Sequence, residues 1–193
     1  MNFRFDIQMY CVVSEETDVI QEKLLDQYSF VIQHKDKQHL KIWYNYEFSF
    51  PFCKVEGNDS GYSFLIDIKE NQKSTCINAI DNLICQDGLI GLNYRDAFKC
   101  MGGDLETPCH FFDEFTVHME NGEPVINQFE IVKELISTAK HICMLIDGNF
   151  GLMDGNAIVQ MLFSDVDDDT EVIFQIHDDE KCENGKLYLW FNQ

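Results

Sequence analysis

The residues with the clearest potential for chemistry are the carboxylates of one acidic run late in the chain. The run Asp165–Glu171, sequence DVDDDTE, places acids at the first, third and fifth positions of a possible calcium loop. Calcium prefers such oxygen ligands, but its loop also needs a glycine at the sixth position and a bidentate acid at the twelfth. Thr170 and Ile176 occupy those positions. The sequence therefore favours an acidic turn or a protein-binding surface over a calcium site.

A second acidic group follows within ten residues, so that the two groups bracket the expected strand 172–176. Carboxylates this crowded repel one another, which raises their pKa values and costs stability unless a cation relieves the repulsion. We therefore expect a cationic partner here, against the alternative that the acids only keep a hairpin tip in solution. The predicted partner-binding residues are Asp165, Asp167, Asp168, Asp169, Glu171, Asp178, Asp179 and Glu180.

A thiol and an imidazole are adjacent only at Cys109-His110. Adjacent side chains normally point apart, so a working nucleophile and base would need an imidazole from elsewhere, such as His141 or His177. The sequence assigns no catalytic residue on this evidence.

Motifs for metals and cofactors are missing. The sequence contains no CxxC, HxxxH or HExxH, and the nearest approximations are Cys100 with Cys109-His110 and His34 with His39. Their spacing does not favour zinc, which needs three or four converging ligands. There is also no GxSxG, no Walker loop and no GxGxxG. We expect neither a metal nor a cofactor.

The charge of the chain is strongly acidic and unevenly distributed. The formal net charge is −20; residues 1–100 contain 15 acids and 10 bases, whereas residues 101–193 contain 19 acids and 4 bases, all of them lysines. Such a field repels nucleic acid and anionic lipid and attracts cationic protein surfaces. We expect a basic protein as the partner, and no direct binding to nucleic acid or to a membrane.

The elements that position these residues show both strand and helix patterns. Period-2 alternation predicts strands at 3–9, 62–68 and 115–119, a hairpin of 29–34 with 40–50, and a closing hairpin of 172–176 with 187–191. Helical spacing predicts helices at 14–27, 74–85, 127–145 and 157–163, with one or two helical turns in 94–101. Together these elements predict an α+β fold, with a mostly antiparallel sheet and three to four helices packed on one face.

Length and composition predict one domain, residues 1–193, and leave open a division into a strand-rich lobe (1–100) and an acidic helix-plus-hairpin lobe (101–193). Polar side chains interrupt the apolar residues at the start of the sequence, so we expect no signal peptide and no transmembrane run. The expected location is the cytoplasm, where the eight cysteines are predicted to be free and mostly buried.

The favoured function is that of an acidic, non-enzymatic inhibitor or immunity-type protein, which binds and neutralises a basic protein such as a nuclease toxin. One alternative is a phage-encoded anti-defence inhibitor that acts as a nucleic-acid mimic. Another is a small cysteine- or carboxylate-dependent enzyme of unfamiliar fold, and a further one is a module whose charge serves only solubility. The sequence makes no prediction of the oligomeric state.

Overall fold

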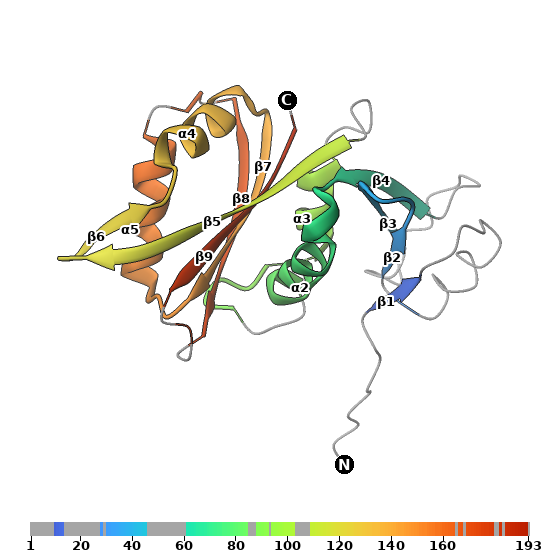
Figure 1. Cartoon of the computed structure of the whole chain (residues 1–193), viewed down its shortest axis with the longest axis horizontal. Helices are drawn as coiled ribbons and strands as arrows, with labels where there is room; N and C mark the ends of the chain where they lie inside the picture. Colours follow the sequence, from blue (N-terminus) through green and yellow to red (C-terminus); the bar gives the residue numbers. More distant parts are fainter. Residues whose placement is uncertain are drawn as a thin grey trace, which may run out of the picture.

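A mixed β-sheet forms the centre of the computed structural model, and helices cover both of its faces (Figure 1). The structure describes residues 10–13, 28, 30–45, 61–84, 88–92, 94–102, 109–164, 166–167, 169–179, 182 and 184–192. Within these ranges the strands are β1 (Tyr10–Val13), β2 (Phe30–His34), β3 (His39–Asn45), β4 (Gly61–Asp67), β5 (Cys109–Glu120), β6 (Glu123–Ile126), β7 (His141–Gly148), β8 (Glu171–Asp178) and β9 (Gly185–Phe191). The helices are the 3-10 helix η2 (Glu70–Gln72) and the α-helices α2 (Lys73–Ile84), α3 (Tyr94–Gly102), α4 (Phe129–Thr138) and α5 (Leu152–Phe163).

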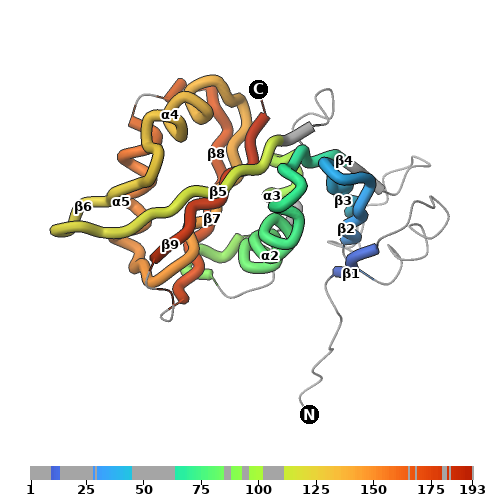
Figure 2. Tube along the Cα trace, viewed as in Figure 1, coloured from blue at the N-terminus to red at the C-terminus, as the bar shows by residue number. Residues whose placement is uncertain are grey.

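The strand order is β1-β2-β3-β4-β5-β9-β7-β8, with β6 paired to β5. Three neighbouring pairs are parallel, namely β1 with β2, β4 with β5 and β7 with β8, and the other pairs are antiparallel. In Figure 2, β5 runs across the molecule from β4 to the β6 hairpin and so joins the two halves of the sheet. The prediction of an α+β fold with a mostly antiparallel sheet is therefore wrong, because the sheet is mixed.

The predicted placement of all helices on one face is also wrong. One buried cluster joins α2 and α3 to the sheet, and a second joins α4 and α5 to its other face. Side chains of β7 alternate between them: Cys143 and Leu145 belong to the first cluster, and Ile142, Met144 and Ile146 to the second. We call these two sides the α2–α3 face and the α4–α5 face.

The largest error of the sequence-based prediction is the helix at 127–145. Helix α4 ends at Thr138, and the following apolar segment His141–Gly148 forms β7. Both faces of β7 are buried, so its sequence is a nearly continuous apolar run, which periodicity alone does not distinguish from a buried helix. The N-terminal end of this helix differs less: α4 begins after Gln128, whose backbone is left-handed (φ 59°) and whose side chain makes no capping hydrogen bond.

The predicted closing hairpin is wrong too. Strand β8 pairs in parallel with β7, and β9 pairs with β5 and β7, so β7 lies between the two supposed hairpin arms. Helix α5 carries the chain from the end of β7 back to the start of β8. Parallel neighbours require such a crossover, whereas a short loop joins only antiparallel strands.

Several other predicted elements are confirmed, and some fall on residues outside the described ranges. The hairpin of β2 with β3, helix α2 and helix α3 are present where the sequence predicts them. Strand β5 extends the predicted strand 115–119 at its N-terminal end, and α5 begins before the predicted 157–163. The predicted strand 3–9 and helix 14–27 lie outside the described residues. Because β4 pairs with β5, the sheet continues across residue 100, and the division into lobes stays a prediction.

The ends of β7 and β9 meet at a close backbone contact. A Cβ atom on Gly148, whose φ is +147°, would come within 2.8 Å of the Gly185 Cα, and Phe150 packs over both glycines. This contact fixes the C-terminal end of β7 beside the start of β9.

Among the described residues, no helix is long and apolar enough to cross a membrane.

Candidate functional site

The predicted partner-binding acids lie at the two ends of β8. Asp167 and Asp169 precede the strand and are exposed, and Glu171 is its first residue. Asp178 is its last residue and is exposed, and the half-buried Asp179 follows. The other three predicted residues, Asp165, Asp168 and Glu180, lie outside the described residues.

The two acidic groups do not form the single hairpin surface that the sequence suggests. Strand β8 has eight residues, and seven steps of about 3.3 Å separate its ends by about 23 Å. The N-terminal group faces the start of β7, where His141 is the partner of Glu171 in the strand register, whereas Asp178 pairs with Gly148 at the other end. We call them the N-terminal and C-terminal acidic ends of β8.

Local contacts hold residues at both acidic ends in place, through the carboxylate of Glu171 and through the backbones of Asp167 and Asp179. The Glu171 carboxylate lies 3.1 Å from His141 Nδ1, and Asp167 closes a turn in which its carbonyl oxygen accepts a hydrogen bond from the Thr170 N–H at 3.0 Å. At the other end, the Asp179 N–H donates to the Gly148 carbonyl oxygen at 3.1 Å. Among the described residues, no group of three or more side chains that could hold a metal ion occurs, and Asp165 of the possible calcium loop lies outside them.

A partly buried polar cluster lies near the C-terminal acidic end, where β7 and β8 end side by side. His177 Nδ1 is 2.8 Å from Asp147 Oδ1, and the side-chain amide of Asn82, from α2, donates to Asp147 Oδ2 at 2.9 Å. The side chains of His177 and Asp147 are only 19% and 13% exposed. Asp147 thus holds the imidazole by one oxygen and is itself held by the other, an arrangement that can position a histidine for proton transfer. We call Asn82, Asp147 and His177 the β7–β8 polar cluster.

Tyr188 of β9 extends this polar region on the same face. Burial raises the pKa of Tyr188 to about 12, and Coulomb interactions with Asp147, Glu114 and Cys182 act in the same direction. Its ring stacks on Phe112 at a centroid distance of 6.2 Å. The hydroxyl group therefore stays protonated at neutral pH and is a hydrogen-bond donor.

The sequence did not identify the β7–β8 polar cluster, although it considered His177 as a base for Cys109. The strand register separates those two residues. Cys109 precedes Phe111, which pairs with Phe191 at the end of β9, whereas His177 pairs with Asp147, which faces Lys186 near the start of β9. The parallel pairing of β7 with β8 places Asp147 beside His177. Had this pairing been predicted, the two residues would have stood out, because ligand sites gather at the carboxyl ends of parallel strands.

Buried thiols carry no nucleophilic chemistry in this fold. Cys76, Cys100 and Cys143 are free and buried, as predicted. Burial raises the pKa of the Cys76 and Cys100 thiols to about 12 and that of Cys143 well above its ordinary value. The half-buried Cys182 donates a hydrogen bond to the Asn184 carbonyl oxygen at 3.0 Å. The side chains of Cys53, Cys85 and Cys109 lie outside the description.

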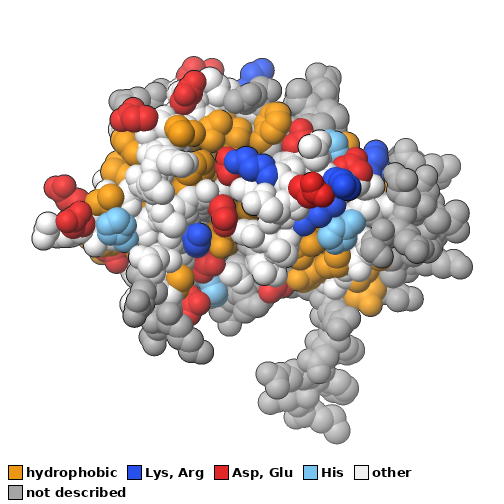
Figure 3. All heavy atoms as spheres, in the orientation of Figure 1, with side chains coloured by type: hydrophobic (Ala, Val, Ile, Leu, Met, Phe, Trp, Pro, Cys, Tyr) orange, Lys and Arg blue, Asp and Glu red, His pale blue; other side chains and the backbone are white. Residues whose placement is uncertain are grey.

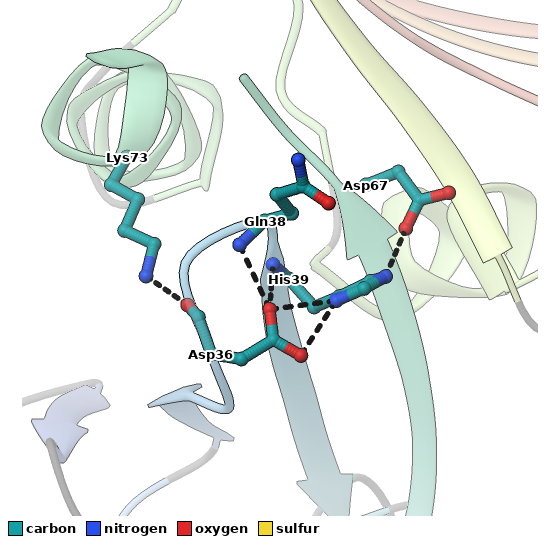
Figure 4. A network of polar contacts seen from close by, with 5 residues as sticks. All are labelled: Asp36, Gln38, His39, Asp67 and Lys73. Carbon is teal, nitrogen blue, oxygen red and sulfur yellow. Dashed lines mark hydrogen bonds and ion pairs between the residues drawn. The ribbon is translucent and has the colours of Figure 1, made fainter. Parts of the chain in front are cut away.

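A separate charged network lies at the β2–β3 turn (Figure 4). His39 Nδ1 is 2.7 Å from Asp36 Oδ1, and His39 Nε2 is 2.8 Å from Asp67 Oδ1 at the end of β4. The Lys73 ammonium group donates to the Asp36 carbonyl oxygen, which joins the turn to α2. Both ring nitrogens of His39 thus face carboxylates, and neither faces His34, the histidine with which the sequence analysis compared it.

Comparisons with known proteins show a partial likeness in structure. No known protein family matches the sequence, and no curated protein matches it. A solved structure of the FtsZ W319Y mutant from M. jannaschii is 16% identical, with a TM-score of 0.48 over 64% of this chain and 39% of that chain. An empty FtsZ dimer from M. jannaschii gives 16% identity and a TM-score of 0.46 over 62% and 37%. This chain therefore spans less than half the length of either FtsZ chain, and no functional statement follows from a likeness at this level.

Proposed function

We propose that this protein binds a basic protein and neutralises it, as an immunity protein does with a nuclease toxin, and that it does so in the cytoplasm. The observation that carries the proposal is the charge of residues 101–193, with 19 acids against 4 lysines and no arginine. A field of this sign can raise the rate of association with a cationic protein by roughly 10–10³-fold. Individual close charge pairs can then add about 1.5–7 kcal/mol of coupling energy.

The exposed acids that the structure describes in residues 101–193 are spread over several elements and do not form one patch. Figure 3 shows Asp and Glu side chains at several separate places on one face, including the β5–β6 tip. Exposed acids occur at that tip (Glu120, Glu123), on α4 (Glu130, Glu134) and at the two acidic ends of β8. A partner that reaches both ends of β8 would have to span about 23 Å, which is within the dimensions of a standard protein interface.

Charge reversal at each end of β8 tests the proposal. We expect the variant Asp167→Lys/Asp169→Lys or the variant Asp178→Lys/Asp179→Lys to lose well over tenfold in affinity for the basic partner that the wild-type protein captures from its host. The control Glu120→Lys/Glu123→Lys makes the same change in charge at the β5–β6 tip. Titration calorimetry at low and moderate salt measures the affinity, and the salt dependence should fall in the variants that weaken binding.

Equal affinity in all three variants would remove β8 from the binding surface. Loss of affinity only in the β5–β6 control would move the site to that tip. A nucleic-acid mimic, as in a phage-encoded anti-defence inhibitor, predicts in addition that DNA competes with this protein for the partner. An immunity protein that binds away from the DNA-binding cleft predicts no such competition.

The β7–β8 polar cluster favours a second candidate, a hydrolase that uses acid–base chemistry. Asp147 orients His177, and His177 would take a proton from water during attack on an ester. The test is hydrolysis of 4-nitrophenyl acetate by the wild-type protein and by His177→Asn. If the protein is such a hydrolase, the rate of hydrolysis by His177→Asn should be at least about a hundredfold lower than that of the wild-type protein. Equal hydrolysis by both proteins would eliminate this candidate, and the control His118→Asn should retain the wild-type rate.

A further inference from the structure

A pocket of about 740 Å³ opens on the α2–α3 face of the sheet, beyond the two helices that cover this face. Thr116 of β5 and Lys186 of β9 are partners in the strand register, and both line the pocket. Their neighbours along the strands, Val117 and Leu187, point into the core of the opposite face. Since no lining residue belongs to α2 or α3, this part of the sheet is accessible from outside. The volume is in the range of small-molecule sites, about 300–1,000 Å³.

The polar wall of the pocket consists of hydrogen-bond donors. Lys186, His118, Thr116 and Asn184 line it. In the described part of the chain, no carboxylate lies within ion-pair distance of the Lys186 ammonium group. Lys186 is one of only four bases among the last 93 residues, where 19 acids are available as partners. An ammonium group left without a carboxylate in such surroundings is free to bind an anion from solution.

The other wall is apolar. Val125 of β6 lines the pocket across from the lysine strand with a side chain that is 37% exposed, whereas the side chain of Ile126, which also lines it, belongs to the core of the opposite face. A ligand that fits both walls carries an anionic group at one end and an apolar body at the other. Burying the apolar body against Val125 would add about 25 cal/mol for each Å² removed from water.

The charges around the pocket favour a ligand with a single negative charge. Asp147 faces Lys186 across the β7–β9 pair, and Glu114 lies two residues before Thr116. Both Asp147 oxygens form hydrogen bonds with His177 and Asn82, and Asp147 forms no ion pair with Lys186 within the described residues, although its negative charge remains close to the lysine. In a protein of net charge −20, each further charge on the ligand adds repulsion, which disfavours a doubly charged phosphate. Repulsion from acids farther away than about 8 Å is largely screened at physiological salt.

We propose that the pocket between β5, β6 and β9 binds a small organic carboxylate with an apolar body, whose carboxylate group pairs with Lys186. This site does not depend on the proposed binding of a basic protein, and its ligand has the opposite charge. Thr116 and Asn184 donate further hydrogen bonds to the carboxylate, and Val125 contacts the apolar body.

Benzoate and its neutral isostere benzamide provide matched probes for titration by NMR. We expect benzoate to shift the resonances of Lys186, Thr116 and Asn184 saturably, with a Kd on the order of 1 mM. Benzamide should bind at least about tenfold more weakly because it cannot form the ion pair. Lys186→Met should weaken benzoate binding at least about tenfold. The control Lys140→Met removes the same charge from an exposed position and should leave the affinity unchanged.

Four results would overturn the proposal. Equal binding of benzoate and benzamide by the wild-type protein would show that Lys186 forms no ion pair with the ligand, and this comparison holds even if Lys186→Met fails to fold. An equal loss of benzoate affinity in Lys186→Met and Lys140→Met would show that the loss comes from the change in net charge and not from the position of Lys186. Tighter binding of inorganic phosphate than of benzoate, or shifts confined to residues outside the pocket, would contradict the proposed ligand class.

Discussion

The ring of Phe150 lies directly over the backbone of Gly185. A Cβ atom added to Gly185 would come within 2.1 Å of Phe150 Cε2 and within 2.9 Å of the Val117 carbonyl oxygen. This contact joins the end of β7 to the start of β9, and it therefore sets the spacing between Asp147 on one strand and Lys186 on the other.

Substitution of Gly185 by alanine should destabilise the protein. The new methyl group would displace the Phe150 ring and press on a strand carbonyl, and overpacking of this kind costs about 1–3 kcal/mol. Urea denaturation measures the change in the free energy of unfolding. The control is Gly91→Ala, because a Cβ atom on Gly91 has nothing within 4 Å. Equal stability of the two variants would show that Phe150 gives way without cost.

Removal of the Asn82 side chain should also destabilise the protein, through Asp147. Asn82→Ala deletes the donor to Asp147 Oδ2 at a carboxylate that is only 13% exposed. A charged acceptor left without its partner in such a position costs about 1–3 kcal/mol. Asn156→Ala, an exposed substitution on α5, is the control and should have little effect. If the two variants unfold at the same urea concentration, water replaces the amide at Asp147 without loss.

The sequence predicted the local elements of this fold better than their connections. The hairpin of β2 with β3 was predictable, because the polar stretch Lys35–Gln38 separates two β-prone runs, and neighbouring antiparallel strands need no information from elsewhere in the chain. Strand β7 was not predictable in this way, because burial on both faces removes the period-2 alternation that marks a strand.

The error at β7 explains why the site was missed. With residues 141–145 assigned to a helix, β8 had no parallel partner and was matched to β9 instead. Asp147 and His177, which are 30 positions apart, become neighbours only once β7 is a strand in register with β8. The acidic ends of β8 were visible in the sequence, but the distance of about 23 Å between them follows from the eight residues of the strand, whereas the predicted strand 172–176 was shorter.

The network at the β2–β3 turn should make stability depend on pH through Asp36. Hydrogen bonds from the Gln38 N–H and from the His39 side chain lower the pKa of Asp36 in the folded protein. The carboxylate therefore stabilises the fold at pH values above its unfolded pKa of about 3.9, and this contribution is lost as the pH falls through the lower, folded pKa.

Thermal unfolding between pH 2 and pH 6 tests this effect. The Tm of Asp36→Asn should lie below that of the wild-type protein at pH 6, and the two should converge as the pH falls. Asp96→Asn removes an exposed carboxylate from α3 and is the control for the change in net charge. Parallel curves for the wild-type protein and Asp36→Asn would mean that Asp36 contributes nothing to the acid dependence.

Tyr188 should make stability depend on pH at the alkaline end. Its pKa in the folded protein is about 12, raised by burial and by Asp147, Glu114 and Cys182, whereas a tyrosine in an unfolded chain ionises near pH 10. The folded state therefore holds this proton more tightly than the unfolded state. The resulting stabilisation is fully present below about pH 10 and is lost as the pH rises towards about 12.

Absorbance at 295 nm follows the ionisation, and Tyr188→Phe should remove one late-titrating group from the curve. Asp147→Asn should shift that group to lower pH because it removes one of the negative charges that hold the proton in place. An unchanged late titration in Asp147→Asn would show that burial alone sets the pKa of Tyr188 and that Asp147 does not act on it.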